Sequence, residues 1–490
     1  MKKASLLLCF LTFFTVTTFA QWSNGMDAEY VIGQPDFISN AEGTGTQGFS
    51  YPYDVAIDIE NGKMYVADLV NCRVLRYAYP ITANNPAAEF VFGQTDFTST
   101  DMNRGGNPAA NTLSFPSAVV IQNSTLWICD NFNNRILKFN NAANLSVNGP
   151  DADGVLGQPG FTTNAQGTSQ NTLWDPYDIA FDNAGNLYVV EANNNRVTRF
   201  DNADGKANGA NADAVLGQNG FTTNIYGTSQ SEFMFPMGVA SDGTNLFVSD
   251  TENNRVLRFD NAAGKANGAN ADGVLGQANF TSGDQNRGGA GCAANTLNWP
   301  AKPALNSDGT LFVSDWTNNR VLLFENATNK ANGADADYVL GQGDFVSNDD
   351  ELVTQNRIWH PNGLDYDEVN GKLVFADEEN CRVLQFAYTT SPPVSVEDED
   401  VMPTEFSLAQ NYPNPFNPTT TINYNISVES HVMLKIYDIL GNEVASLVNE
   451  ILPAGNYKAQ FDASDLSTGI YIYQIIAGNF SAAKQMMLLK

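Results

Sequence analysis

The chain has 490 residues, more than one ordinary hydrophobic core accommodates, so we expect two or more domains. A hydrophobic content of 43% and an aromatic content of 11% exclude a mainly disordered chain. The formal charge of −29, with no local basic patch in the sequence, argues against a nucleic-acid partner because such a field repels phosphate backbones.

The N-terminus has the pattern of a secretory signal peptide. Lys2 and Lys3 form a charged start, residues 5–19 are largely apolar, and Thr18 and Ala20 place small side chains before a cleavage point after Ala20. No later stretch approaches the roughly 20 apolar residues that cross a bilayer. We therefore predict a signal peptide over 1–20, an exported chain and no transmembrane segment.

Six repeat units follow the leader. Each has a proline segment, an apolar run that ends in an acid, and a strand that begins with arginine, and the arginines recur at intervals of 59 to 65 residues. The acids and arginines, in chain order, are Asp68 and Arg73, Asp130 and Arg135, Glu191 and Arg196, Asp250 and Arg255, Asp315 and Arg320, and Asp377 and Arg382. Because a buried arginine needs a partner, we interpret these residues as structural pairs rather than as a catalytic acid ring.

The runs within each unit are short, β-branched and aromatic, and turn residues separate them. No segment of comparable length has helical periodicity. Four short strands in each of six units predict an all-β fold, a six-bladed β-propeller, because radial closure leaves only short and protected strand edges. An open β-solenoid is the alternative, although its coils are shorter.

The proline segment, the LYVxD run and the NNRVxRF strand resemble the NHL repeat of six-bladed propellers, in every unit from 51 to 388. The resemblance implies that these segments are the first, second and third strands of a blade, and that the VxGQ motif is the fourth, outer strand. VIGQPDF (31–37) precedes all units, and no copy follows the last. Tyr30–Gly33 would then complete the sixth blade, in a propeller domain over 21–390. We expect the repeated glycine of this motif to permit a bulge or a close strand approach.

Four cysteines remain after the leader, too few to form a disulfide framework. Cys72 and Cys381 occupy the same position in the first and last units, where the middle units have asparagine. A bridge between them and two buried free thiols both remain open, although equivalent positions on adjacent blades tend to lie farther apart than a disulfide allows.

Residues that differ between units are better candidates for ligand binding than the repeated ones. The loops that follow the outer strands are long, and Arg104 and Arg287 lie in similar NRGG segments of opposite blades. With Arg357, beside Trp359 and His360, they would form a basic spot at the channel mouth that suits a carboxylate or a sulfated glycan. Local salt bridges and turn formation are the alternative.

Two connectors rich in Asp, Asn and Gly contain oxygen ligands of the kind that calcium prefers: Asp201, Asp213, Asp260 and Asp272. Their spacing fits no EF-hand, and turn chemistry explains them as well. The histidine zinc ligands of the amidating lyases related to the NHL family are missing, since the chain has only His360 and His431. We find no catalytic constellation and expect no cofactor, with calcium as the exception.

The chain changes character after the last unit. Residues 391–404 form an acidic linker with prolines, and 405–490 contain alternating runs that predict a small β-sandwich. YPNPFNP and IYDILGNEV resemble the C-terminal sorting domain of the type IX secretion system. The resemblance implies contact with that machinery, carriage across an outer membrane, and release or surface anchoring. A carbohydrate-binding sandwich is the alternative.

Two classes of function follow from these features. The first is a monomeric, secreted or surface propeller that binds a protein, peptide or glycan at its channel mouth. The second is a secreted hydrolase or lyase with carboxylate or calcium chemistry. The low histidine content and the near identity of the third and fourth blades favour the first, and fold alone does not decide.

Overall fold

The computed structural model describes residues 22–289, 291–349, 352–388, 406–408, 411, 416–428, 430–439, 441–464, 466–478 and 480–489. The predicted signal peptide and the whole of the predicted linker, 391–404, lie outside these residues. The chain divides into one unit of residues Ala20–Thr389 and a second that contains Thr390–Lys490. Among the described residues, no helix has the length and apolar character that crossing a membrane requires.

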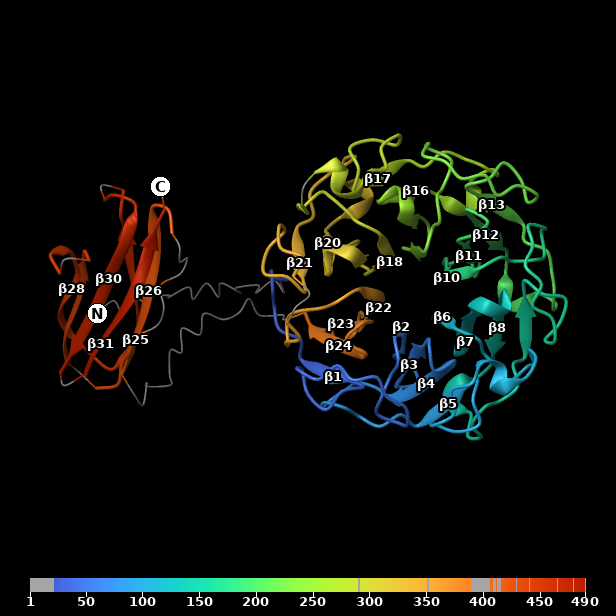
Figure 1. Ribbon diagram of the computed structural model, residues 1–490, viewed down its shortest axis with the longest axis horizontal. Helices are drawn as coiled ribbons and strands as arrows, with labels where there is room; N and C mark the ends of the chain where they lie inside the picture. Colours follow the sequence, from blue (N-terminus) through green and yellow to red (C-terminus); the bar gives the residue numbers. More distant parts are fainter. Residues whose placement is uncertain are drawn as a thin grey trace, which may run out of the picture. The chain divides into compact units, whose positions relative to one another are not determined.

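Six four-stranded antiparallel sheets form the first unit and lie in a ring (Figure 1). From the centre of the ring outwards, sheet 1 contains β2 (Pro52–Asp58), β3 (Lys63–Asp68), β4 (Arg73–Ala78) and β5 (Phe90–Phe92), and sheet 2 contains β6 (Pro116–Gln122), β7 (Thr125–Asp130), β8 (Arg135–Phe139) and β9 (Gly154–Leu156). In the same order, sheet 3 contains β10 (Pro176–Phe181), β11 (Leu187–Glu191), β12 (Arg196–Phe200) and β13 (Ala214–Leu216), and sheet 4 contains β14 (Gly238–Ser241), β15 (Leu246–Asp250), β16 (Arg255–Phe259) and β17 (Gly273–Leu275). Sheet 5 contains β18 (Pro300–Leu305), β19 (Leu311–Asp315), β20 (Arg320–Phe324) and β21 (Tyr338–Leu340), and sheet 6 contains β22 (Pro361–Asp367), β23 (Lys372–Asp377), β24 (Arg382–Ala387) and β1 (Tyr30–Ile32).

The connections contain short 3-10 turns and, in the described part of the chain, no α-helix. These turns are η1 (Met102–Gly105), η2 (Asn131–Asn133), η3 (Ala142–Asn144), η4 (Ala203–Gly205), η5 (Thr251–Asn253), η6 (Ala262–Gly264), η7 (Gln285–Gly288), η8 (Trp316–Asn318) and η9 (Ala327–Asn329).

The core lies between neighbouring sheets. On β3, Tyr65 and Ala67 pack against sheet 2, whereas Met64 and Val66 pack towards sheet 6, as the two-residue period of a strand requires. Each innermost strand contacts the innermost strands of the sheets on both sides, including β22 with β2. An all-β chain of four-stranded antiparallel sheets arranged in this way is consistent with a β-propeller.

The N-terminal segment takes part in two sheets. β1 pairs antiparallel with β24, with Val31 opposite Leu384. Just before it, Gly25 donates its N–H to the carbonyl of Val339, and Asn24 Oδ1 accepts the Val339 N–H at 3.0 Å. An Asn–Gly pair from the following connector caps the outer strands of sheets 1, 2, 3 and 4 in the same manner. The N-terminal segment therefore supplies a strand to sheet 6 and a cap to sheet 5.

The VxGQ motif is a structural device. Gly33 has φ of +85°, and a Cβ there would collide with the ring of Phe49. The side-chain amide of Gln34 donates to the carbonyl of Cys381 at 2.9 Å and to that of Ala41 at 2.8 Å. The other five glutamines make the corresponding bonds. The glycine permits the predicted close approach, and the glutamine ties the outer strand to the turn before the third strand.

Each repeated acid pairs with the repeated arginine of its own sheet. The six N–O distances run from 2.6 to 2.9 Å, and all twelve side chains are fully buried. In sheet 1, Asp68 also accepts the N–H of Ser50 at 2.8 Å, and Arg73 donates to the carbonyl of Gly48 at 2.9 Å. These bonds satisfy both buried charges and fasten the long loop that precedes the sheet.

The four cysteines of the first unit are buried free thiols. In the middle units the matching asparagine accepts a backbone N–H of the next sheet, as Asn195 does from Phe235 at 2.8 Å. Cys72 and Cys381 stand at this place, beside the N–H groups of Phe115 and Tyr51. Burial raises the pKa of both thiols to about 11, so they stay protonated at neutral pH.

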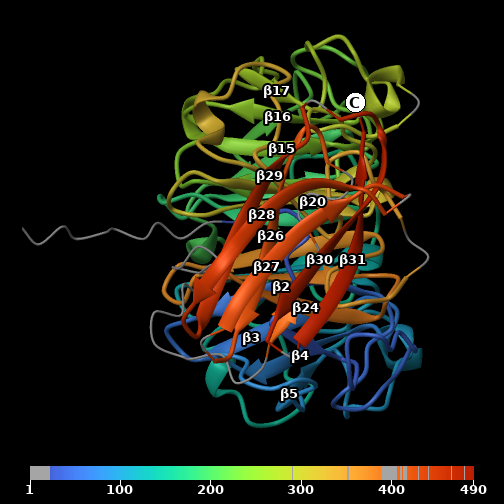
Figure 2. The same cartoon turned by 90° about the vertical axis from the view of Figure 1, so that its left-hand side faces the viewer.

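Two sheets around one shared core form the second unit (Figure 2). The strands are β25 (Ser407–Leu408), β26 (Thr419–Ile426) and β29 (Gly455–Asp462) in one sheet, and β28 (Glu443–Leu452), β27 (Ser430–Tyr437), β30 (Gly469–Ala477) and β31 (Phe480–Leu488) in the other. Ile422 and Tyr424 of the first sheet meet Leu434 and Tyr473 of the second in this core.

Candidate functional site

Arg104 and Arg287 do not face each other across the channel. The Arg104 guanidinium donates to the carbonyls of Gly93 at 3.0 Å and Gly149 at 3.1 Å, beside the outer strand of sheet 1. Arg287 makes the matching bonds to Gly276 at 3.2 Å and Gly333 at 2.9 Å, beside the outer strand of sheet 4. Their loops fold back onto the outer strands, so the guanidinium groups hold backbone at the rim and do not form the predicted basic spot.

The other three predicted ligand residues lie around the loop before β22. Arg357 contacts the side-chain oxygen of Gln342 and lies 3.7 Å from Asp349. His360 stacks on Trp316 with ring centroids 3.6 Å apart. Trp359 is 5.9 Å from His360 between ring centroids. The structure thus brings Trp359 and His360 together and leaves Arg357 tied to the outer strand of sheet 5.

The four aspartates predicted as calcium ligands pair with cations of the same connector or of the strand before it. Asp201 pairs with Arg199 at 2.6 Å and Asp213 with Lys206 at 2.6 Å. Asp260 and Asp272 pair with Arg258 at 2.8 Å and Lys265 at 2.5 Å. Within the described ranges, no group of three or more His, Cys, Asp or Glu side chains is placed to hold a metal. Turn chemistry and ion pairing account for these connectors, and calcium binding stays an untested prediction.

Aromatic side chains gather where the innermost strands begin, at one end of the channel. A pocket of about 180 Å³ lies there, and we call it the mouth pocket. Its lining residues are Tyr53, Tyr177, Phe235, Met237, Trp299, Ala301, Trp316 and Glu378. They belong to sheets 1, 3, 4, 5 and 6, and they lie at or just before the start of an innermost strand or just after a second strand. Ring centroids are 6.2 Å apart for Tyr53 and Tyr177, and 6.3 Å for Trp299 and Trp316.

Glu378 is the one acidic group of the mouth pocket. Its carboxylate accepts hydrogen bonds from Trp316 Nε1 at 2.9 Å and Asn362 Nδ2 at 3.0 Å. Burial raises its pKa to about 7. Among the described lysines and arginines, none forms an ion pair with it. The pocket therefore combines aromatic walls with a carboxyl group whose charge is not balanced by a neighbour.

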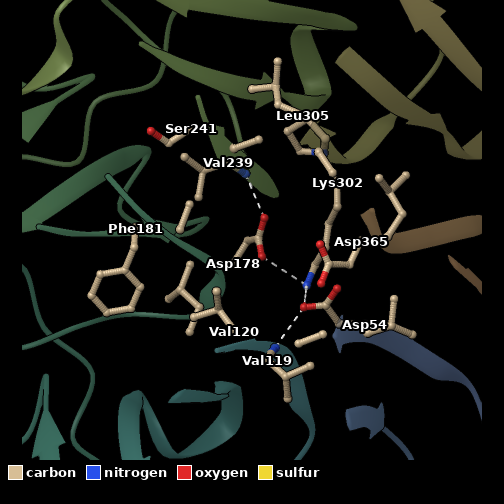
Figure 3. Close-up of a pocket in the computed structure, with 18 residues that line it drawn as sticks. Asp54, Val119, Val120, Asp178, Phe181, Val239, Ser241, Lys302, Leu305 and Asp365 are labelled. Atoms are coloured by element: carbon tan, nitrogen blue, oxygen red, sulfur yellow. Dashed lines mark hydrogen bonds and ion pairs between the residues drawn. The ribbon is translucent and has the colours of Figure 1, made fainter. Parts of the chain in front are cut away.

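A polar cluster lines a second pocket between the innermost strands (Figure 3). Lys302 Nζ lies 3.0 Å from Asp54 and 3.2 Å from Asp178, and it donates to the carbonyl of Ser117 at 2.6 Å. Asp365 lines the same space and accepts the N–H of Ile57 at 2.7 Å. These residues belong to sheets 1, 2, 3, 5 and 6, so one buried ammonium group joins strands from across the ring.

The channel carboxyls titrate abnormally because they are buried. Burial raises the pKa of Asp178 to about 7 although Lys302 opposes the shift, and it raises that of Asp365 to about 7. The pKa of Lys302 is itself raised, since Asp178 and Asp54 outweigh the burial of its ammonium group. We infer that Lys302 keeps its proton and that its positive charge is satisfied inside the channel.

A second, polar cleft adjoins the mouth pocket. It is lined by Glu252, Asn254, Asp284, Gln285 and Asn286 together with backbone glycines. Trp299 lines both the apolar pocket and this acidic, amide-rich cleft.

One sequence pattern, the residue before the repeated proline, indicates part of the mouth pocket. The residue before the repeated proline is Tyr51, Phe115, Asp175, Phe235, Trp299 and His360 in the six units. All six have positive φ, which turns the chain into the innermost strand. Phe235 and Trp299 at this position line the mouth pocket. Trp316 and Glu378 stand elsewhere in their units, and their approach depends on how sheets 5 and 6 pack.

Among known protein families, one matches this chain, and it matches the C-terminal end. Residues 410–489 match the family described as a secretion system C-terminal sorting domain. No curated protein is similar enough in sequence to match this chain.

Several solved structures resemble the chain weakly. PorZ of Porphyromonas gingivalis, a bacterial surface component of the type IX secretion system, is 12% identical with a TM-score of 0.41, over 92% of this chain and 53% of PorZ, so the chain spans about half of that protein. A gluconolactonase of Xanthomonas campestris is 12% identical with a TM-score of 0.39, over 74% and 98%. A streptogramin B lyase is 12% identical with a TM-score of 0.38, over 70% and 96%. Scores this low support no statement about function.

The C-terminal match decides the route of export. The family covers 410–489, the part of the chain in which two sheets share a core. The YPNPFNP segment lies partly outside the described residues, whereas the IYDILGNEV run spans the end of β27 and the start of β28. The chain carries a C-terminal sorting domain of the type IX secretion system, which directs it to the cell surface or the medium.

Proposed function

We propose that the chain is an exported six-bladed propeller that binds an extracellular ligand in its mouth pocket. The six sheets would be the blades, and β1 would close the ring as the outer strand of the last blade. The pairing of β1 with β24 and the contact of β22 with β2 support this closure. The NHL-like repeats support the same assignment.

The observation that carries the binding proposal is the asymmetry of the mouth pocket. Residues that hold the ring together recur in every sheet, such as the buried acid and arginine. The residue after that acid, in contrast, is Thr251 in sheet 4, Trp316 in sheet 5 and Glu378 in sheet 6. An architectural requirement would repeat, whereas a ligand site in a single ring is free to differ from sheet to sheet. Large aromatic side chains beside few polar groups are typical of such sites.

The test is a screen of the full chain against glycan and peptide arrays. We expect at least one class of ligand to bind and the Trp299→Ala variant to lose that binding. Trp359→Ala is the matched control, because Trp359 lies near the mouth without lining the pocket. An Arg104→Ala, Arg287→Ala, Arg357→Ala triple variant tests the basic spot directly. Binding that survives Trp299→Ala and disappears in the arginine variant would move the site and contradict this proposal.

A further inference from the structure

The mouth pocket has the composition of an aromatic cage. Five of its eight lining residues are aromatic, and they come from four different sheets. Tyr177 lies between two of the other rings, with centroids 6.2 Å from Tyr53 and 5.8 Å from Phe235. The faces of such rings carry partial negative charge and attract cations that lose their water. Apart from the rings themselves, Glu378 is the one polar side chain among the residues that line the pocket.

Two aromatic rings of this protein already lie close to cationic side chains of the same chain. Lys302 Nζ lies 5.6 Å from the centroid of Tyr53, and the Arg76 guanidinium carbon lies 4.4 Å from that of Phe90. Lys302 is nevertheless balanced, because Asp54 and Asp178 both lie within ion-pair distance. Its positive charge therefore opposes a second cation at Tyr53 only weakly.

Glu378 supplies the counter-charge for a cation in the pocket. It is 7% exposed, lines the pocket and forms no ion pair within the described part of the chain. Its two hydrogen-bond donors are neutral, the indole of Trp316 and the amide of Asn362. Burial of a carboxylate without a cation nearby is unfavourable, and a cationic ligand would offset this cost in free energy. An anionic ligand would be repelled by this carboxylate and by the formal net charge of −29 on the chain.

We propose that the mouth pocket binds an alkylammonium group, with its methyl or methylene groups against the aromatic walls and Glu378 as counter-ion. This assignment rests on the proposed function and names the ligand chemistry. The volume of about 180 Å³ suits a compact group of this kind. By comparison, an apolar protein cavity of about 150 Å³ accommodates benzene. The ammonium group belongs either to a small molecule or to a lysine side chain of a peptide.

The experiment titrates the full chain with choline and with 3,3-dimethyl-1-butanol, its uncharged isostere, by calorimetry and tryptophan fluorescence. We expect choline to bind about tenfold more tightly than the isostere, the ratio that a cation–π and counter-ion advantage of roughly 1.4 kcal/mol gives. Glu378→Gln and Trp316→Ala should each weaken choline binding by a similar factor. Phe132→Ala is the control, since Phe132 is an exposed ring outside the pocket.

The source of the ammonium group is tested with lysine-containing and trimethyllysine-containing peptides. Tighter binding of these peptides than of choline assigns the site to a protein partner, and the reverse assigns it to a small molecule. Equal affinity for choline and its isostere, or no saturable binding of any of these probes, overturns the inference. If an array ligand still depends on Trp299 in that case, the proposed binding function stands while the cationic assignment fails.

Binding should also depend on pH. The ligand favours ionised Glu378, whose pKa in the free pocket is about 7, so choline affinity should rise from pH 6 to pH 8. The charged or titratable groups around it are Glu379, Asp175, Tyr53, Tyr177, Lys302 and His360. Glu378→Gln should remove most of the pH dependence. A slope that persists in this variant would assign the titration to a neighbouring group.

Discussion

Buried arginines mark every sheet of the ring, and each is held by an acid and by loop carbonyls. Asp250 and Arg255 illustrate the arrangement: the ion pair is 2.7 Å long, and Arg255 also donates to the carbonyls of Ser229 at 2.8 Å and Glu232 at 3.1 Å. Burial alone would make both charges unfavourable. The arginine therefore connects two chain segments only as long as its acid is ionised and present.

Asp250→Asn should destabilise the protein strongly. The amide retains the shape of the carboxyl group but leaves the Arg255 guanidinium buried without a counter-charge, which costs about 3–5 kcal/mol. Urea unfolding followed by tryptophan fluorescence measures the loss. Asp272→Asn is the control, because its pair with Lys265 is partly exposed and worth at most about 1 kcal/mol. Equal losses in the two variants would contradict the structural interpretation, and an Asp250→Asn, Arg255→Met double variant that recovers stability supports it.

Repetition explains why some residues were predictable and others were not. Asp250 and Arg255 recur in all six units, so the sequence alone predicted their pairing. Arg104 recurs once, as Arg287, and the sequence placed both in loops after an outer strand, but the direction in which the Arg104 loop folds depends on the Gly149 cap that another unit supplies. Glu378 is unique, and its approach to Trp316 depends on the packing of two sheets, which no local pattern encodes.

We propose that closure of the ring depends on the N-terminal segment. Within it, Trp22, Val31 and Ile32 are buried against sheets 5, 6 and 1. β1 covers the edge of β24, which would otherwise expose unpaired backbone groups. The sequence predicted the closing strand from the offset between the first and last VxGQ copies. It did not predict the Asn–Gly cap on Val339, because that contact looks like an ordinary turn until the sheets are assembled.

Deleting residues 22–33 should destabilise the whole ring rather than one edge. Burial of three large apolar side chains is worth roughly 6 kcal/mol, at about 2 kcal/mol each, and the sheets share continuous cores. The measurement is the urea midpoint of the truncated chain compared with a chain that lacks 391–402, a segment of equal length in the predicted linker. Restoration by a synthetic peptide of residues 22–33 identifies the lost contacts as the cause. An unchanged midpoint would show that the ring closes without this segment.

The channel cluster belongs to the whole molecule, because its members come from five sheets. Lys302, Asp54 and Asp178 connect sheets 5, 1 and 3. Gly238 and Gly363 occupy the matching positions of sheets 4 and 6, and a Cβ at Gly363 would collide with Asp54. Charged and small residues therefore alternate around the axis, which allows the side chains to meet at the centre. This arrangement joins distant sheets at the cost of burying three carboxyl groups near one lysine.

Stability should consequently fall as the pH rises from about 4 to 7. Asp178 and Asp365 have folded-state pKa values of about 7, above the ordinary value of 3.8. In this window the folded protein binds more protons than the unfolded chain, so the free energy of unfolding decreases with pH and levels off above pH 7. Asp365→Asn should flatten this dependence, since its amide oxygen still accepts the N–H of Ile57 and the group no longer titrates.

Thermal unfolding of the parent protein and of Asp365→Asn between pH 4.5 and 7.5 measures the difference. Asp242→Asn is the matched control, because it makes the same substitution in an exposed turn. Repulsion within this acidic chain affects both variants alike, so it cancels in their comparison. Because Asp54, Asp367 and Lys302 surround Asp365, a flatter curve in this variant alone traces the effect to the channel. Parallel curves for the two variants would show that the buried cluster titrates outside this window and that the surface charge sets the slope.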